Sequence, residues 1–255
     1  METVKIGHVG RRTALLSLMG KLSQGWFMAS PDEITRAELA QAMQRLFGRE
    51  RIGGKPEIFG RGIPFAFGDP GQLLSEAGFS DTPTLAAAID TPPGFLYILS
   101  HASTSRQFQH RWRDFADQTE RARAPQRKWT KELRRRSYVA LLTDSLQSDL
   151  IPLLSSIGKG MGHFLALGAE RLIEFFDGVP TLHVEIELVT ERNQHWDREV
   201  QPNDTLDISF LSAAIPYCDF VVTERFWVNL AGRKKLDKKY NTVLLSDLTE
   251  LNNYL

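Results

Sequence analysis

Residues 203–227, which read NDTLDISFLSAAIPYCDFVVTERFW, constrain the fold of this chain more than any other stretch. Turn residues precede an apolar-rich run, which predicts a helix over residues 206–215. We expect this helix to end before Pro216, because a proline pushes the preceding residue out of the helical region. Residues 220–223 are apolar and β-branched, as in a strand that is covered on both faces. The stretch therefore predicts a helix followed by a buried strand of a parallel sheet.

Three acidic side chains fall close to one end of this helix and strand. Asp204 and Asp207 lie in the first helical turn, and Glu224 directly follows the strand. Ligands of open α/β sheets bind outside the carboxyl ends of the strands, where we expect these acids to meet. Clustered carboxylates repel one another unless a cation neutralises them, and Mg²⁺ and Mn²⁺ prefer oxygen ligands. The pattern predicts a Mg²⁺ or Mn²⁺ site for phosphodiester hydrolysis, although a helix cap is an equally good interpretation of Asp204 alone.

Residues 207–224 resemble the C-terminal core of PIN-domain nucleases. In that family an acid opens a helix of the form D-x-x-x-x-x-A, and a buried strand then leads to T-x-D. Asp207 and Thr223 fit this spacing, whereas Glu224 directly follows the threonine and Arg225 stands where the family has its last aspartate. The resemblance implies a Rossmann-like α/β/α fold, a cluster of catalytic acids, Mg²⁺ or Mn²⁺, and endoribonuclease activity.

The start of the chain departs from the PIN pattern. The family begins with a strand that ends in the first catalytic aspartate, whereas the opening METVKIGHVGRR reads as helix. By resemblance to larger PIN-like proteins, Glu2 is the preferred second acid, which implies an internal start or a truncated relative. The rival is Glu38, in a helix that Ser30 and Pro31 open. Its position on the helical wheel, away from the apolar face, predicts contact with solvent.

The expected fold class is α/β, with a PIN-like, Rossmannoid parallel sheet, a large helical insertion and a helix-rich composition overall. We expect a single domain over residues 1–255, and a hydrophobic content of 42% is ample for its core. Its expected parts are an N-terminal helical part over 1–50, a helical and loop insertion over 51–180, and the acidic half of the core over 181–255.

Two basic stretches are candidate contacts for RNA. Residues 105–136 hold eleven Lys or Arg and four Asp or Glu, and residues 233–239 read RKKLDKK. Basic side chains neutralise phosphates, although a solvated face is the alternative interpretation of such stretches. The candidate RNA-binding residues are Arg134, Arg135, Arg225, Lys234 and Lys235.

The composition narrows the class of protein. The single cysteine, Cys218, excludes an internal disulfide framework and suits a reducing compartment. No apolar run reaches membrane-spanning length, and the acidic start is unlike a secretory signal. We therefore expect a cytoplasmic protein with no membrane partner. The six histidines are scattered, so a zinc site is not expected.

These patterns predict a metal-dependent endoribonuclease in which Asp204, Asp207 and Glu224 hold the cation and Glu2 contributes a further acid. A role as a toxin or defence effector fits a bacterial PIN-like protein. The alternative is a truncated or non-catalytic PIN-like protein that binds or assembles with another protein or with a second copy of itself.

Overall fold

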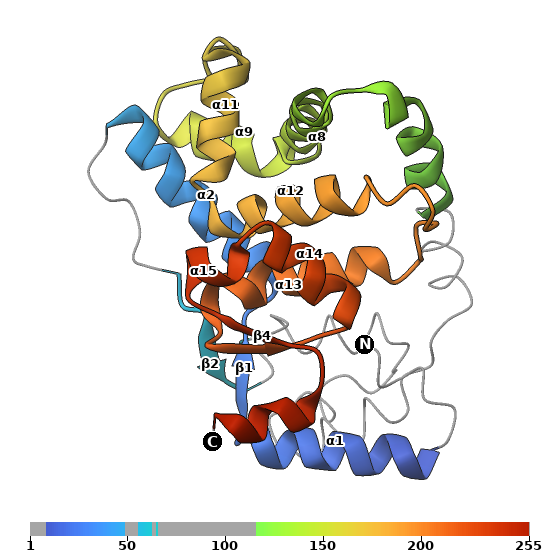
Figure 1. Ribbon diagram of the computed structural model, residues 1–255. Helices are drawn as coiled ribbons and strands as arrows, with labels where there is room; N and C mark the ends of the chain where they lie inside the picture. Colours follow the sequence, from blue (N-terminus) through green and yellow to red (C-terminus); the bar gives the residue numbers. More distant parts are fainter. Residues whose placement is uncertain (1–8, 49–55, 63–64, 66–115, 255) are drawn as a thin grey trace. The chain divides into compact units, whose positions relative to one another are not determined.

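The computed structural model describes residues 9–48, 56–62, 65 and 116–254, and Figure 1 shows their arrangement. The expected second acid, Glu2, lies outside these residues, as does most of the expected loop and insertion before residue 116. The chain divides into two compact units, which are residues 1–30 with 57–111 and residues 31–56 with 112–255.

In the first unit, helix α1 (Val9–Ser23) leads into the first strand of a short antiparallel pair. The helix ends where Gln24 and Gly25 take positive φ angles of 51° and 78°, which turn the chain into strand β1 (Trp26–Met28). β1 pairs with β2 (Phe59–Arg61).

The second unit is mostly helical. Its α-helices are α2 (Pro31–Phe47), α8 (Lys131–Ser145), α9 (Gln147–Ser156), α10 (Met161–Leu165), α11 (Gly168–Asp177), α12 (Pro180–Arg192), α13 (Asp204–Tyr217), α14 (Arg225–Arg233) and α15 (Leu236–Tyr240). Residues 116–123 are also helical, and two 3₁₀ helices, η2 and η3, cover Ala124–Lys128 and Leu248–Asn253. The strands are β3 (Phe220–Val222) and β4 (Val243–Leu245).

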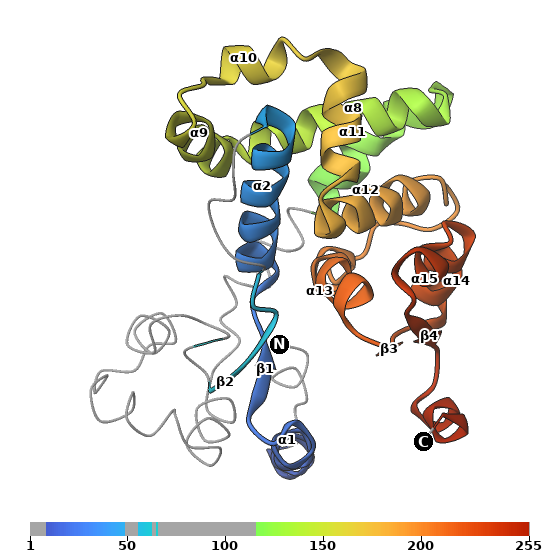
Figure 2. The same cartoon turned by 90° about the vertical axis from the view of Figure 1, so that its left-hand side faces the viewer.

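Helix α12 lies at the centre of this unit and joins two hydrophobic clusters. It contacts α2, α8, α11, α13 and α14, and it runs beside α13 in Figures 1 and 2. Leu182 and Ile186 belong to one cluster, whereas Val184 and Leu188 belong to the other, and each is at most 2% exposed. Positions two apart on a helix point in nearly opposite directions, so α12 is buried on both sides. Each such side chain contributes about 1.5–3 kcal/mol by burial.

Strands β3 and β4 form a parallel pair in which Val221 lies opposite Leu244. Parallel strands need a crossover, and α14 and α15 provide it. Within the described residues, this pair and the antiparallel β1–β2 pair are the two sheets. The helix-rich α/β character is confirmed, whereas an extended PIN-like parallel sheet is not seen in these residues.

The predicted end of α13 is wrong, because the helix continues through Pro216 to Tyr217. Pro216 lies in the last turn, so the chain loses one hydrogen bond there rather than a run of them. The hydroxyl of Thr242 lies 2.6 Å from the carbonyl oxygens of both Ile215 and Cys218 and satisfies this helix end. The helix end is therefore set by a contact with the chain just before β4.

Candidate functional site

Asp204, the first residue of α13, is 1% exposed and fully engaged by protein donors. Arg198 donates two hydrogen bonds of 2.8 Å, one to each carboxylate oxygen of Asp204. The backbone N–H of Gln201 donates to Oδ2 at 3.1 Å, and a nitrogen of Arg192 lies 3.8 Å from the same oxygen. Asp204 is thus the buried carboxylate of an ion pair rather than the N-cap, which is Asn203.

Asp207 and Glu224 lie on neighbouring elements. The indole N–H of Trp227, a residue of α14 that is 1% exposed, donates to Oδ2 of Asp207 at 3.0 Å. Glu224 is exposed and immediately precedes α14, where its carbonyl oxygen accepts the N–H of Val228 at 3.1 Å. The start of α13 and the end of β3 are therefore joined at the first turn of α14.

Arg198 is the cation that pairs with Asp204. Its hydrogen bonds with Asp204 come first among the interactions that raise its pKa, and the charges of Glu224 and Asp207 act in the same direction. Its guanidinium also lies 4.1 Å from the centre of the Phe226 ring. We call Asp204, Asp207 and Glu224, with Arg198 among them, the acidic cluster.

The acidic cluster in this arrangement does not fit a Mg²⁺ or Mn²⁺ ion. Both oxygens of Asp204 already accept N–H groups, so its lone pairs face the protein rather than a cation. A divalent ion beside Arg198 would also be repelled by the guanidinium. Within the part of the chain that the structure describes, no group of three or more His, Cys, Asp and Glu could hold a metal ion.

Arg123 holds the segment that carries Arg198. The Arg123 side chain is 3% exposed and donates to the carbonyl oxygens of His195 at 3.2 Å and Arg198 at 2.9 Å. Glu120 pairs with Arg123 at 2.7 Å and accepts the N–H of Val200 at 3.0 Å. The segment between α12 and α13 is thus fixed by a helical turn about 75 residues earlier in the chain.

Glu38 of α2 caps the start of α12, and the prediction that it faces solvent is wrong. It is 3% exposed, and its Oε2 accepts the N–H and the hydroxyl of Thr181 at 2.9 and 2.7 Å. The Tyr217 hydroxyl donates to Oε1. Burial raises the pKa of Glu38 above its ordinary value, although these hydrogen bonds oppose the rise. The helical wheel failed because α12 and α13 cover the side of α2 that the pattern assigned to solvent.

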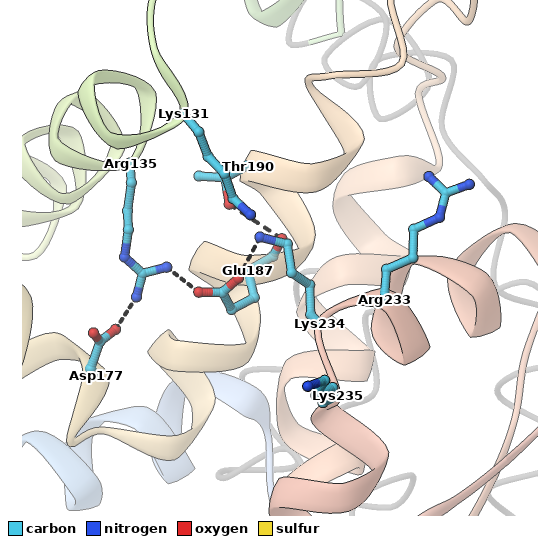
Figure 3. Close-up of a pocket in the computed structure, with 8 residues that line it drawn as sticks. All are labelled: Lys131, Arg135, Asp177, Glu187, Thr190, Arg233, Lys234 and Lys235. Atoms are coloured by element: carbon cyan, nitrogen blue, oxygen red, sulfur yellow. Dashed lines mark hydrogen bonds and ion pairs between the residues drawn. The ribbon is translucent and has the colours of Figure 1, made fainter.

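A second feature is a pocket of about 360 Å³ with a basic lining, shown in Figure 3. We call it the basic pocket. Its lining residues come from α8, α11, α12 and the end of α14, and are Lys131, Arg135, Asp177, Glu187, Thr190, Arg233, Lys234 and Lys235. Five of them are cationic and two are acidic, so the lining carries an excess of positive charge.

Glu187 organises the basic pocket. Arg135 bridges Asp177 and Glu187, and Lys234 lies 2.7 Å from Oε2 of Glu187, so that Arg135 and Lys234 approach it from opposite sides in Figure 3. Burial opposes the ionisation of Glu187, but Lys234 and Arg135 outweigh it and hold its pKa below the ordinary value. Lys131 and Lys235 are exposed and have no ion-pair partner among the described residues.

The candidate RNA-binding residues lie in three places. Arg135, Lys234 and Lys235 meet at the basic pocket, although about a hundred positions separate the first from the others. Arg134 lies instead against Trp196, at 5.7 Å from the ring centre, and Arg225 is exposed at the start of α14. These two do not line the pocket.

Sequence reasoning missed three important residues. Lys131 precedes Arg135 by four positions, and this helical spacing was a signal that both share one face. Arg198 and Glu187 offered no comparable signal, because their partners come from other elements.

No helix in the described residues is long and apolar enough to cross a membrane. Comparisons of the chain with protein-family models, with curated proteins and with solved structures found no match.

Proposed function

We propose that this protein binds RNA and holds the phosphate backbone in the basic pocket. The observation that carries the proposal is the meeting of α8 with the turn between α14 and α15. This meeting brings cations from two basic stretches of the sequence to one concave surface. The protein would then be an RNA-binding protein whose contact with RNA does not require the acidic cluster.

The charges within the basic pocket support this role. Glu187 neutralises part of the charge of Arg135 and Lys234, so the lysines of the lining that have no ion-pair partner among the described residues make the main contact with phosphate. Lys131 and Lys235 are exposed, so their ammonium groups can exchange water for phosphate oxygens. Each phosphate that is neutralised on a single strand releases counterions, which makes the affinity depend on salt.

Fluorescence anisotropy with a labelled single-stranded RNA tests the proposal. We expect a combined Lys131→Ala and Lys235→Ala variant to bind roughly tenfold more weakly, a loss of about 1.4 kcal/mol. The slope of log K against log salt should fall by about 0.7 for each phosphate contact that is lost. Lys21→Ala, at an exposed lysine of α1 that does not line the pocket, is the matched control. Equal affinity of the double variant and this control would rule out the basic pocket as the RNA contact.

Metal-dependent hydrolysis of RNA is a second candidate function. It is favoured by the hydrogen bond from Trp227 to Asp207, which joins this acid to the helical turn that follows Glu224. A metal would have to displace Arg198 to reach these acids, and a toxin or defence role belongs to this candidate. Cleavage of labelled RNA that requires Mn²⁺ and is lost in Asp207→Asn would establish it. If RNA is bound but not cleaved, RNA binding is supported and hydrolysis is not.

A further inference from the structure

We propose that Arg198 is the built-in counter-ion of Asp204 and occupies the position beside the acidic cluster at which the sequence pattern predicts a divalent cation. The inference concerns a position in the fold that the basic pocket does not include, so it does not rest on RNA binding. It assigns to one side chain the neutralising role that the sequence pattern assigned to a metal.

Arg198 and Asp204 form a bidentate pair. Two N–H groups of one guanidinium meet the two oxygens of one carboxylate, both at 2.8 Å. This parallel, bidentate arrangement is the one for which the planar guanidinium fork is suited, and a lysine could not reproduce it. A third donor, the N–H of Gln201, completes the shell of Asp204. The carboxylate is therefore satisfied without any external cation.

The negative charge of buried Asp204 is balanced by two neighbouring arginines. Asp204 is 1% exposed, and an ionised carboxylate at such a depth requires a compensating charge. Arg198 supplies it directly, and Arg192, 3% exposed, adds a second guanidinium at 3.8 Å. A divalent ion that entered this position would meet two fixed positive charges. Until those charges moved away, the ion would gain little favourable interaction energy from the acids.

Arg198 is held in position by contacts of its backbone and of its side chain. Its carbonyl oxygen accepts a hydrogen bond from buried Arg123, and its guanidinium lies 4.1 Å from the centre of the Phe226 ring. Val200, two residues later, is tied to Glu120. Backbone and side chain are therefore both fixed on the acidic cluster. These contacts would be unnecessary if Arg198 reached the acidic cluster only occasionally.

Binding of Mn²⁺ to the full chain tests this inference. Electron paramagnetic resonance of free Mn²⁺ measures uptake, and thermal unfolding with Mn²⁺ or with EDTA measures its effect on the fold. We expect the wild-type protein to take up no Mn²⁺ at the acidic cluster and to unfold at the same temperature in both solutions. Uptake near one ion per chain that is weakened by Asp207→Asn or Glu224→Gln would overturn the inference.

A gain of binding in a variant provides the converse test. Arg198→Ala leaves Asp204 without its counter-ion, so we expect a lower unfolding temperature that Mn²⁺ partly restores. Combining Arg198→Ala with Asp207→Asn should remove this restoration. Arg225→Ala is the matched control, because it deletes an exposed arginine beside Glu224 and leaves the bidentate pair intact. An Arg198→Ala protein that is as stable as wild type without any metal would contradict the proposed role. If this variant does not fold, the Mn²⁺ uptake of the wild-type protein decides.

Discussion

The indole N–H of Trp227 donates to Oδ2 of Asp207 across 3.0 Å and joins the first turn of α13 to α14. The indole ring is buried in the hydrophobic cluster that α12 shares with α13 and α14, while its polar edge reaches the carboxylate. This hydrogen bond therefore links the packing of the core to the position of Asp207. The proposed hydrolysis of RNA requires this acid, whereas the proposed RNA binding does not.

Replacing Trp227 by phenylalanine should reduce the stability of the second unit. The variant keeps an aromatic ring but loses the N–H donor and some volume, and we expect a loss of about 1–3 kcal/mol. Urea unfolding followed by circular dichroism measures the change. Trp26→Phe is the control, because Trp26 is 48% exposed and such substitutions usually change stability by less than about 0.5 kcal/mol. Similar losses in both variants would show that the hydrogen bond to Asp207 is unimportant.

Arg123 should stabilise the segment that carries Arg198. Arg123→Met removes hydrogen bonds from a charged donor to two carbonyl groups, and we expect a loss of about 2–3 kcal/mol. Hydrogen exchange should increase between α12 and α13, most clearly at the N–H of Val200, which Glu120 accepts. Arg121→Ala is a close control, since Arg121 is exposed and donates only to the carbonyl oxygen of Asp117 within its own helix. Unchanged exchange at Val200 would disprove this anchoring.

Glu187 should affect stability and RNA binding in opposite directions. Glu187→Gln removes the negative charge that Arg135 and Lys234 share, and we expect a loss of stability of about 1–3 kcal/mol. The two freed cations should tighten RNA binding by roughly fivefold, or about 1 kcal/mol. Thermal unfolding and anisotropy measure the two effects. Glu174→Gln, in an exposed pair with Arg171, is the control and should change neither. Weaker RNA binding by Glu187→Gln would count against the basic pocket.

Glu38 should give the protein a specific dependence on pH. Burial raises the pKa of Glu38 above its ordinary value of 4.5, so the folded state holds this proton more tightly than the unfolded chain. Its contribution is fully present below pH 4.5 and is lost as the pH rises through the raised pKa. The advantage of wild type over Glu38→Gln in free energy of unfolding should therefore decrease from acid to neutral pH. Urea unfolding of both proteins over this range measures it, and an advantage that increases with pH would refute the assignment.

Local patterns predicted several elements well. The helix expected over residues 206–215 lies within α13, and the strand expected over residues 220–223 contains β3. Capping groups and runs of β-branched residues act within a few positions, so their effect can be read from neighbouring residues. The end of α13 could not be predicted in this way, because Thr242 completes it from a distant part of the chain.

The sequence by itself predicted a helix and a strand over residues 206–223, and acids at the start of α13 and after β3. The tertiary structure alone decided what those acids contact. It placed Arg198 against Asp204, covered Glu38 with α12 and α13, and brought Lys131 to Lys235 at one pocket. The reason is physical: a side chain's charge and shape are local properties, whereas its burial and its partner depend on how separate elements pack.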